Sequence, residues 1–443
     1  MSVTLPKEIY YKQAASLPEG TQSNSIVASP INGATFGPSS IIQFDLVQRG
    51  YLVPESMYIR YKNTITGGVA AAVNGMKGTP VYTPFSRLET IVGSQVVESI
   101  QNYHQLCNML VNCKMNYSQK LGLAYPFGYG STQAASSVVA DVFNLGTAAV
   151  NGLSLVAQTN AAVLNVSVAA PLGCILSNAD NLVPLKYMPS CRIQLTTDSL
   201  ANCFLLAAAA ANAIQGYSLS NLELCYDVID FSPMVDQAIS SMNGGKLTIK
   251  SQSYLSSGVT TGVLAAGTVE YLFNQRLASI KSLFCHLTGG GGAGVSLNGL
   301  FDSCDITSGA GDYQWFIGGA PYPPRPISTV LNKAGVMMEL SAAFGPAHDL
   351  LTSNFSITPT EFNSSNATVT TLATMGKFYL GTNVEKLSTN GALLTGISSQ
   401  GSPISFRVSA NNGAANSQTI QLICCYDALL EVDMMARSLI VLQ

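Results

Sequence analysis

The stretch Asn221–Asp230 reads NLELCYDVID, and Gln421–Leu430 reads QLICCYDALL. Both contain Cys-Tyr-Asp, at Cys225 and again at Cys425, an offset of 200 residues in a chain of 443. Every second residue leading into each motif is apolar or cysteine, which is the pattern of a strand with one buried face. Two halves that end on the same strand indicate two copies of one β-domain. Such a duplication is more typical of a building block than of a catalyst.

A second pattern, Arg-Leu-x-x-Ile, supports the duplication. It occurs in Pro84–Ile91 and again in Phe273–Ile280, with Arg87 and Arg276 separated by 189 residues. The two patterns come in the same order in each half. We therefore expect each half to contain an Arg-Leu strand, a helix, further strands and the Cys-Tyr-Asp strand.

The composition is poor in charge. Charged residues make up 10% of the chain, against about 25% in ordinary soluble proteins. A weakly charged surface is prone to association, so we expect partners to cover much of it. The net charge is −3 and the sequence has no run of Lys or Arg. Binding of a nucleic acid through a basic tail is therefore not predicted.

The sequence predicts no export and no membrane span. Met1–Gly20 lacks the charged start and apolar run of a signal peptide, and the apolar stretch Leu200–Ile214 is too short to cross a bilayer. Without export, the cysteines are expected to be reduced, buried and small hydrophobic residues. The ten are Cys107, Cys113, Cys174, Cys191, Cys203, Cys225, Cys285, Cys304, Cys424 and Cys425.

Short antiparallel strands with one apolar face dominate the pattern. The clearest alternations are Ile42–Leu46, Met57–Tyr61, Cys191–Leu195, Leu247–Ile249 and Phe406–Val408.

Two helices and three long loops interrupt the strands. One helix is predicted over Gln95–Tyr117, and the other over Ser328–Phe344, with Ser328 as N-cap and Gly345-Pro346 as the stop. The loops are Gly67–Gly78, Ala134–Ala170 and Thr389–Gly401. The boundary between the halves is expected near Phe231–Asn243.

Candidate sites for cofactors and metals are weak. Gly289–Gly294 (GGGGAG) matches G-x-G-x-x-G, but no helix opens after it, so a flexible loop is predicted. His104, Cys107 and Cys113 share one helix, where a metal site would need a second ligand pair nearby. A buried helix face is the preferred interpretation. Cys424 and Cys425 are adjacent in a strand, point to opposite faces and are poorly placed to chelate one ion.

Candidate catalytic residues are equally few. The histidines are His104, His286 and His348, and none lies in a recognisable nucleophile signature. Asp227 and Asp427 are interpreted as strand-edge or capping residues. Tyr322–Pro326 (YPPRP) is interpreted as a rigid connection into the second helix. No catalytic, cofactor-binding or metal-binding residue is therefore predicted.

The chain resembles the double jelly-roll major capsid proteins of the lineage that includes tectiviruses, adenoviruses and virophages. The resemblance is carried by RLETIVGSQVVESIQNYHQL (Arg87–Leu106), taken as strand, Gly-Ser turn and helix entry. LVPLKYMPSCRIQL (Leu182–Leu195) is taken as the next strand pair, and WFIGGAPYPPRPIS (Trp315–Ser328) as the segment leading to the second helix.

The resemblance implies an all-β fold of two tandem eight-stranded jelly-roll sandwiches, over residues 1–235 and 236–443, each with a short helix. It implies a major capsid protein whose homotrimers form pseudo-hexagonal capsomers of an icosahedral shell in the virion. The partners would be neighbouring capsomers, penton and minor capsid proteins, and an internal membrane or a genome bound without sequence-specific contacts. No small-molecule substrate, cofactor or enzymatic activity is expected.

Two other classes stay open at this point. A secreted or surface-displayed β-rich adhesin or layer protein would share the low charge, and it would favour an export signal and disulfides. A β-sandwich hydrolase or lectin would need clustered acids, a histidine-centred site or aromatic platforms. The single tryptophan, Trp315, and three histidines argue against that class.

Overall fold

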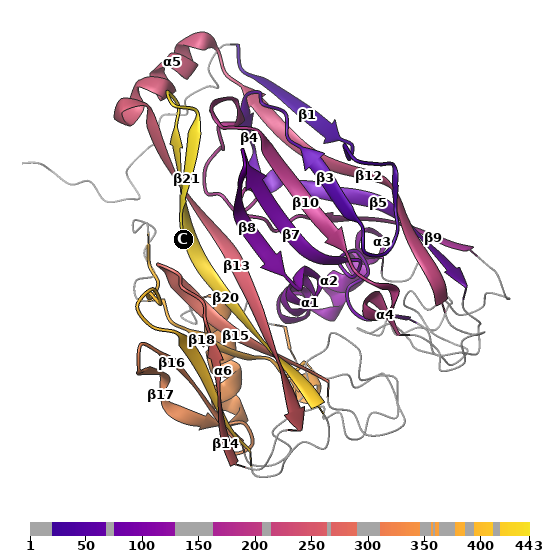
Figure 1. Ribbon diagram of the computed structural model, residues 1–443, viewed down its shortest axis with the longest axis vertical. Helices are drawn as coiled ribbons and strands as arrows, with labels where there is room; N and C mark the ends of the chain where they lie inside the picture. The colour runs from indigo at the N-terminus through magenta and orange to yellow at the C-terminus, as the bar shows by residue number, and fades with distance from the viewer. Residues whose placement is uncertain are drawn as a thin grey trace, which may run out of the picture.

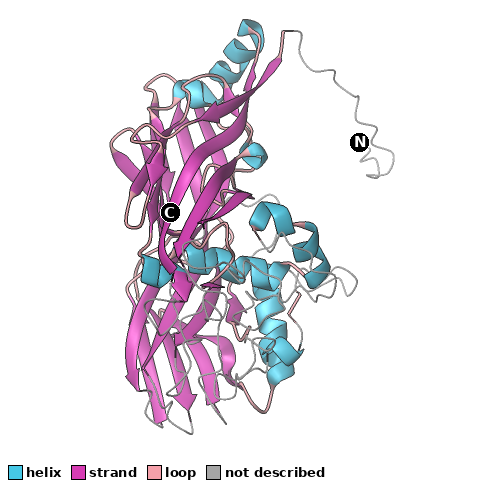
Figure 2. Cartoon of the chain, turned by 90° about the vertical axis from the view of Figure 1, so that its right-hand side faces the viewer, coloured by secondary structure: helices cyan, strands magenta, loops and turns pink. Residues whose placement is uncertain are grey.

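A computed structural model describes most of the chain, namely residues 20–67, 75–128, 163–205, 214–263, 267–289, 311–345, 356–357, 359–362, 377–385, 394–410 and 417–443. In these ranges the first and second halves each form a sandwich of two antiparallel sheets (Figure 1). We name them the first roll and the second roll. The two rolls follow one another along the long axis of the molecule, and most of the helices lie together on one side (Figure 2).

The first roll consists of two four-stranded layers with short additions. One layer has the order β1-β12-β5-β9 and the other β3-β10-β7-β8. Their bounds are β1 Gln22–Ala28, β3 Ile41–Asp45, β5 Tyr58–Gly67, β7 Phe85–Val92, β8 Gln95–Gln101, β9 Val163–Pro171, β10 Cys191–Thr197 and β12 Ile214–Asp230. The short strands β2 (Thr35–Phe36) and β4 (Tyr51–Leu52) pair with β12, and β6 (Gly75–Met76) pairs with β11 (Phe204–Leu205).

The second roll repeats this plan. Its layers have the orders β13-β20-β15-β18 and β14-β19-β16-β17, and β21 (Ser438–Leu442) extends the first of them. The bounds are β13 Lys246–Val263, β14 Gly267–Phe273, β15 Ile280–Gly289, β16 Gly311–Ile317, β17 Ala320–Ser328, β18 Leu380–Asn383, β19 Ile404–Ala410 and β20 Ser417–Asp433.

The connectivity of the two rolls is identical. If the eight main strands of each roll are counted along the chain, both rolls have sheets in the order 1-8-3-6 and 2-7-4-5. The last strand therefore lies beside the first in both, as β12 beside β1 and β20 beside β13. The Cys-Tyr-Asp motifs occupy these two equivalent strands. The duplication predicted from them is thus confirmed by the topology.

The helices are α1 Tyr103–Lys114, α2 Tyr117–Gly122, α3 Ala124–Phe127, α4 Leu200–Cys203, α5 Pro233–Ser241, α6 Lys333–Phe344 and α7 Pro359–Phe362. Helix α1 follows the fifth strand of the first roll, and α6 follows the fifth strand of the second. Helix α5 joins β12 to β13, in the segment where the sequence suggests a boundary. In the described part of the chain, no helix is both long and apolar enough to span a membrane.

The alternation pattern predicted the core well. Ile42, Phe44, Ile193 and Leu195 are fully buried between the layers of the first roll. In the second roll, Trp315 is buried with its ring centroid 4.3 Å from that of Phe406. These apolar faces drive the collapse of each sandwich, because strands bury every second side chain.

The helix predicted over Gln95–Tyr117 begins too early. Gln95–Gln101 is strand β8, which forms a hairpin with β7 through the turn at Gly93, where φ is +63°. Helix α1 begins only after Asn102. The resemblance to a strand, a Gly-Ser turn and a helix entry therefore missed one strand. Ladder hydrogen bonds to β7 decide the conformation of this segment, and local periodicity cannot show them.

The second helix was predicted to begin at Ser328, and it begins at Lys333. Asn332 is the N-cap, and its side-chain oxygen accepts a hydrogen bond from the amide of Gly335 at 3.0 Å. Ser328 instead caps a turn, accepting from the amide of Leu331 at 3.1 Å. The predicted end at Phe344 is confirmed.

Three other segments differ from expectation. Arg276 and Leu277 lie between β14 and β15, so the second Arg-Leu pattern is not a strand, and its match with β7 is not a structural equivalence. Tyr322–Pro326 belongs to strand β17 rather than to a connection, which is possible because an edge strand tolerates proline. In Leu182–Leu195 only β10 is a strand of the sandwich, because Leu185–Tyr187 forms a 3₁₀ turn.

The predicted loops are only partly described. Residues 68–74, 129–162 and 386–393 of these loops lie outside the described residues. The loop Ala134–Ala170 was predicted too long, since β9 occupies Val163–Pro171.

Candidate functional site

The contact between the two rolls contains buried polar groups from both rolls. Strand β13, the first strand of the second roll, lies along the first roll (Figure 1). The carbonyl of Lys250 accepts from the amide of Asp180 at 2.9 Å, and the carbonyl of Gln252 accepts from the side chain of Asn178 at 3.0 Å. The connection between β9 and β10 thus occupies the edge of β13, which would otherwise expose unpaired backbone groups.

Glu98 is the buried carboxylate of this junction. It is 2% exposed and lies on β8 of the first roll. Its carboxylate accepts hydrogen bonds from Thr90 Oγ1 at 2.8 Å, from the amide of Ile175 at 2.9 Å and from Ser253 Oγ on β13. Burial raises the pKa of Glu98 despite these hydrogen bonds. One side chain therefore ties two strands of the first roll to the second roll.

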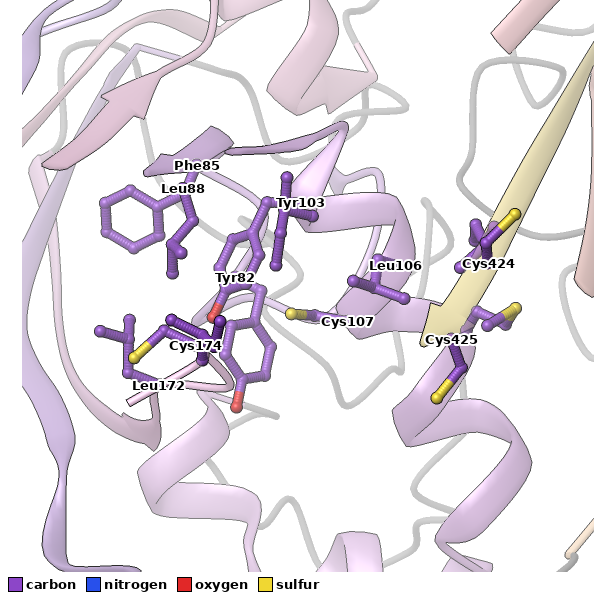
Figure 3. Packing of buried hydrophobic residues seen from close by; sticks show 14 of the residues in the cluster. Tyr82, Phe85, Leu88, Tyr103, Leu106, Cys107, Leu172, Cys174, Cys424 and Cys425 are labelled. Atoms are coloured by element: carbon purple, nitrogen blue, oxygen red, sulfur yellow. The ribbon is translucent and has the colours of Figure 1, made fainter. Parts of the chain in front are cut away.

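Helix α1 forms the apolar side of the same junction. It belongs to the first roll, yet Leu106 lies on the side of the helix toward Cys424 and Cys425 of β20, whereas the sulfur of Cys107 points the opposite way, toward Tyr82 (Figure 3). Nine of its twelve residues are buried. Near its end, Asn112 Nδ2 donates to the hydroxyl of Tyr379 at 3.3 Å. A helix buried on all sides holds two bodies together, because it contributes apolar area to both.

Asp427 is the centre of a second buried network. It is fully buried in β20, and Oδ2 accepts from Ser279 Oγ at 2.9 Å, from the amide of Thr395 at 3.0 Å and from Thr395 Oγ1 at 3.0 Å. The Nζ atoms of Lys250 and Lys281 both lie 3.8 Å from Oδ1. A buried carboxylate requires such compensation by donors and cations. The network joins three strands of the second roll and the Thr395 segment.

Asp227, the counterpart of Asp427, has much weaker contacts. It is half-buried in β12, and its Oδ1 accepts from Ser25 Oγ at 2.6 Å. Both aspartates lie in strands with a neighbour on either side. Their prediction as strand-edge or capping residues is therefore wrong, since pairing on both sides is invisible in the sequence.

Asp236 anchors helix α5 to the first roll. Its carboxylate accepts from the hydroxyls of Tyr51 at 2.7 Å and Tyr187 at 3.1 Å, and it forms an ion pair with Lys186. Burial raises the pKa of Asp236, but the hydrogen bonds from Lys186 and Tyr51 outweigh burial and leave it below its ordinary value. The helix that connects the rolls is thus held by one carboxylate.

The three candidate metal ligands on α1 do not form a metal site. His104, Cys107 and Cys113 are all buried, as predicted for a helix face. His104 Nε2 faces Asp198 Oδ2 at 3.4 Å. Within the described ranges, no group of three His, Cys, Asp or Glu side chains has the geometry to hold a metal ion.

The remaining candidate residues do not converge. His286 is buried on β15 beside the side-chain oxygen of Gln421 (3.3 Å), with its ring 5.4 Å from that of Tyr379. Cys424 and Cys425 lie on opposite faces of β20, as predicted. His348, Cys304 and the stretch from residue 290 to Gly294 lie outside the described residues.

The nine described cysteines are all buried and free of disulfides. Burial raises the pKa of Cys107, Cys174, Cys191, Cys203 and Cys425 to about 12. We expect these five thiols to react at least tenfold more slowly with a thiol reagent at pH 8 than after denaturation, because the thiolate is the reactive form. All ten should react in denaturant without reductant, and fewer than ten would reveal a disulfide.

The sequence of the chain matches no protein-family model and no curated protein. Solved structures do match it. The chain is similar to the Faustovirus major capsid protein, with 11% identity and a TM-score of 0.61 over 97% of this chain and 93% of that one. The capsid structure of the virus PBCV-1 gives 9% identity and a TM-score of 0.59 over 96% and 97%. The mavirus major capsid protein gives 10% identity and a TM-score of 0.54 over 100% and 95%. The fold is the double jelly roll.

The strand orders 1-8-3-6 and 2-7-4-5 in each roll agree with this fold, and the similarity extends over both rolls. The sequence analysis missed Glu98, Asp180 and Asp236, which make polar contacts between the rolls or at the helix that connects them. The sequence contains a signal for Glu98, because an acidic residue that follows Val97 in an apolar segment is expected to need a hydrogen-bond partner if it is buried. One such partner, Ser253, lies 155 residues away in the sequence, so it can be identified only from the three-dimensional structure.

Proposed function

We propose that this chain is a viral major capsid protein whose trimers form pseudo-hexagonal capsomers of an icosahedral shell. The observation that carries the proposal is the double jelly-roll fold along nearly the whole chain, which it shares with major capsid proteins. Two rolls of identical connectivity in each chain give six similar bodies in a trimer. Six similar bodies around one axis make a tile with nearly equivalent sides, and such tiles can cover a flat facet.

The role is structural rather than enzymatic. The polar side chains that converge in the described ranges, around Glu98, Asp427 and Asp236, each hold elements of the fold together. The low charge of the chain supports dense association, because little electrostatic repulsion has to be overcome. The adhesin alternative gains no support from the cysteines, since no disulfide occurs among the nine described.

Several finer features belong to the proposal. The two rolls would be the domains 1–235 and 236–443, with α5 at their boundary. The mature protein would reside in the virion capsid. Its partners would be neighbouring capsomers, penton and minor capsid proteins, with a membrane or genome beneath the shell bound without sequence-specific contacts.

The purified chain is expected to sediment as a trimer of about 140 kDa, three chains of 46.5 kDa. Negative-stain images should show particles with a hexagonal outline, because each trimer contains six rolls. Analytical ultracentrifugation and imaging of the same fraction test both statements. A stable monomer of 46.5 kDa or an elongated rod would contradict the capsomer.

A further inference from the structure

The two carboxylate oxygens of Asp427 have different surroundings. Oδ2 accepts the three hydrogen bonds described above, from Ser279 Oγ and from the amide and hydroxyl of Thr395. Oδ1 is buried and has no hydrogen-bond partner among the described residues. It faces two amines instead, since the Nζ atoms of Lys250 and Lys281 each lie 3.8 Å away. The two oxygens are thus suited to different roles in a reaction at the carboxyl carbon.

Lys281 lies between Asp427 and a second carboxylate. Its Nζ atom is 3.6 Å from Oε1 of Glu385, and Thr395 Oγ1 lies 2.6 Å from the same oxygen. The side chains of Lys281 and Glu385 are 21% and 16% exposed. An amine held between two carboxylates and largely shielded from water can pass protons to either of them. Glu385 is therefore placed to take a proton from this amine.

A bulge in β15 directs Lys281 toward β20, which lies beside β15 (Figure 1). Ile280 is opposite Tyr426. Ser282 is opposite the preceding residue, Cys425, so Lys281 is the extra residue of the bulge. A bulge changes the direction in which a side chain points. The position of the amine is therefore fixed by the pairing of two central strands.

The first roll contains the equivalent acid without the amine. Asp227 occupies the place of Asp427 in the Cys-Tyr-Asp strand. Tyr58 pairs with Cys225 as Ser282 pairs with Cys425, and the residue before Tyr58 is Met57. The combination of a buried acid, an adjacent lysine and a second acid thus belongs to the second roll.

We propose that the second roll contains a site of autocatalytic isopeptide-bond formation, at which the amine of Lys281 condenses with the carboxyl group of Asp427 and water leaves. Glu385 is the proton acceptor and donor of this reaction. The product is a covalent link between β15 and β20. The reaction occurs within one chain and happens once, so it goes beyond the structural role of the chain without making it an enzyme.

The step balances within the three side chains. The ammonium group of Lys281 gives one proton to Oδ1, and the resulting amine attacks Cγ of Asp427. The nitrogen then gives a second proton to Glu385, which returns it to the hydroxyl group at Oδ1. This oxygen leaves as water when the N–C bond has replaced the C–O bond. An ammonium and a carboxylate become an amide and water, and Glu385 ends in its starting form.

The surroundings of Oδ2 favour the reaction. Negative charge develops on Oδ2 when the nitrogen attacks, and the donors of Ser279 and Thr395 lie between 2.9 and 3.0 Å from it. This is the arrangement of an oxyanion hole. The same donors can bind the amide oxygen of the product. Burial of Asp427 keeps out the water that would hydrolyse the bond, and the fold holds amine and carboxyl group together.

Mass spectrometry of the denatured full chain tests the bond. The wild-type chain is expected to weigh one water molecule less than its sequence mass. Trypsin does not cleave after an acylated lysine, so the digest should contain a branched peptide that joins Lys281 to the segment Val408–Arg437. The ion pair of Lys246 with Glu431 is the internal control. Its atoms are closer, at 3.3 Å, but its lysine side chain is 57% exposed, so no branch is expected there.

Three variants assign the roles. Lys281→Arg keeps the positive charge but cannot form the amide, so it should have its full sequence mass. Glu385→Gln should form the link at least about tenfold more slowly than the wild-type chain, because the proton acceptor is lost. Lys246→Arg should still lose one water. The fluorescence of Trp315, which is buried in the second roll, verifies that this roll folds in each variant.

A wild-type chain with its full sequence mass, or a branched peptide that starts from Lys250, would overturn the bond between Lys281 and Asp427. Loss of water that persists in Lys281→Arg would do the same. Linking of Glu385→Gln at the wild-type rate would overturn the role of Glu385. If a variant fails to fold, the branched peptide of the wild-type chain decides alone. The bond lies within the second roll, so its outcome is independent of the capsomer.

Discussion

Replacement of Asp427 by alanine should lower the free energy of unfolding of the second roll by about 2–4 kcal/mol. The carboxylate is fully buried, and its loss leaves the amide of Thr395 and the hydroxyl of Ser279 without their acceptor. The same replacement at Asp227 should cost about 1 kcal/mol or less, because that side chain is half-buried and accepts a hydrogen bond from the side chain of Ser25 near the surface. The duplication thus supplies a matched control from within the chain.

Trp315 makes the measurement selective. It is the single tryptophan and lies in the interior of the second roll, so its fluorescence reports unfolding of that roll. Urea titrations at one fixed protein concentration, since assembly would otherwise shift the midpoints, should lower the fluorescence midpoint for Asp427→Ala. Far-UV circular dichroism, to which both rolls contribute, should show the smaller shift expected for Asp227→Ala. Asp427→Asn should fall between wild type and alanine, because the amide oxygen still accepts. Equal shifts for Asp427→Ala and Asp227→Ala would contradict the network.

Glu98→Ala is expected to destabilise the junction between the rolls by about 2–4 kcal/mol, since three donors around the carboxylate would be left unsatisfied. Glu98→Gln should change stability by about 1 kcal/mol or less at neutral pH. The glutamine oxygen can accept from Thr90 and the amide of Ile175, and its NH₂ can donate to Ser253. Glu98→Ala removes the hydrogen-bonding side chain, whereas Glu98→Gln keeps its shape and removes only the ionisable group. Comparing the two variants therefore separates the two effects.

The free energy of unfolding should also depend on pH differently in the wild-type chain and in Glu98→Gln. Burial raises the pKa of Glu98, so the folded chain binds this proton more tightly than the unfolded chain. Its contribution to stability is fully present below the ordinary carboxyl pKa of about 4.3 and is lost as pH rises through the raised value. Wild type should therefore lose stability relative to Glu98→Gln over that window.

Urea midpoints measured from pH 4.5 upward test the sign of this effect. Glu55→Gln, at an exposed carboxylate, is the control and should follow the wild-type curve. A wild-type chain that gains stability relative to Glu98→Gln as pH rises would show that the carboxylate is charged in the folded state and compensated by its donors.

The sequence predicted the fold class and the duplication, and missed the contacts between the halves. Alternation in segments such as Ile42–Leu46 and Cys191–Leu195 is a local property, and the structure confirms it there. The helix predicted from Gln95 failed because strand β8 is stabilised by pairing with β7, which the spacing of Val97, Ile100 and His104 cannot show. The second Arg-Leu match misled because a pattern of three residues carries too little information to define a register.

The sequence by itself determined that the chain is all-β, weakly charged and duplicated, because side-chain periodicity and composition act locally and are written residue by residue. Only the tertiary structure decided that Asp427 is buried while Asp227 is half-open, that Glu98 meets Ser253, and that α1 is enclosed while α6 is exposed. Asp227 and Asp427, like α1 and α6, occupy equivalent positions in the two rolls but have different neighbours. Burial depends on partners more than a hundred residues away, and the same Cys-Tyr-Asp therefore carries a fully buried aspartate in one roll and a half-buried aspartate in the other.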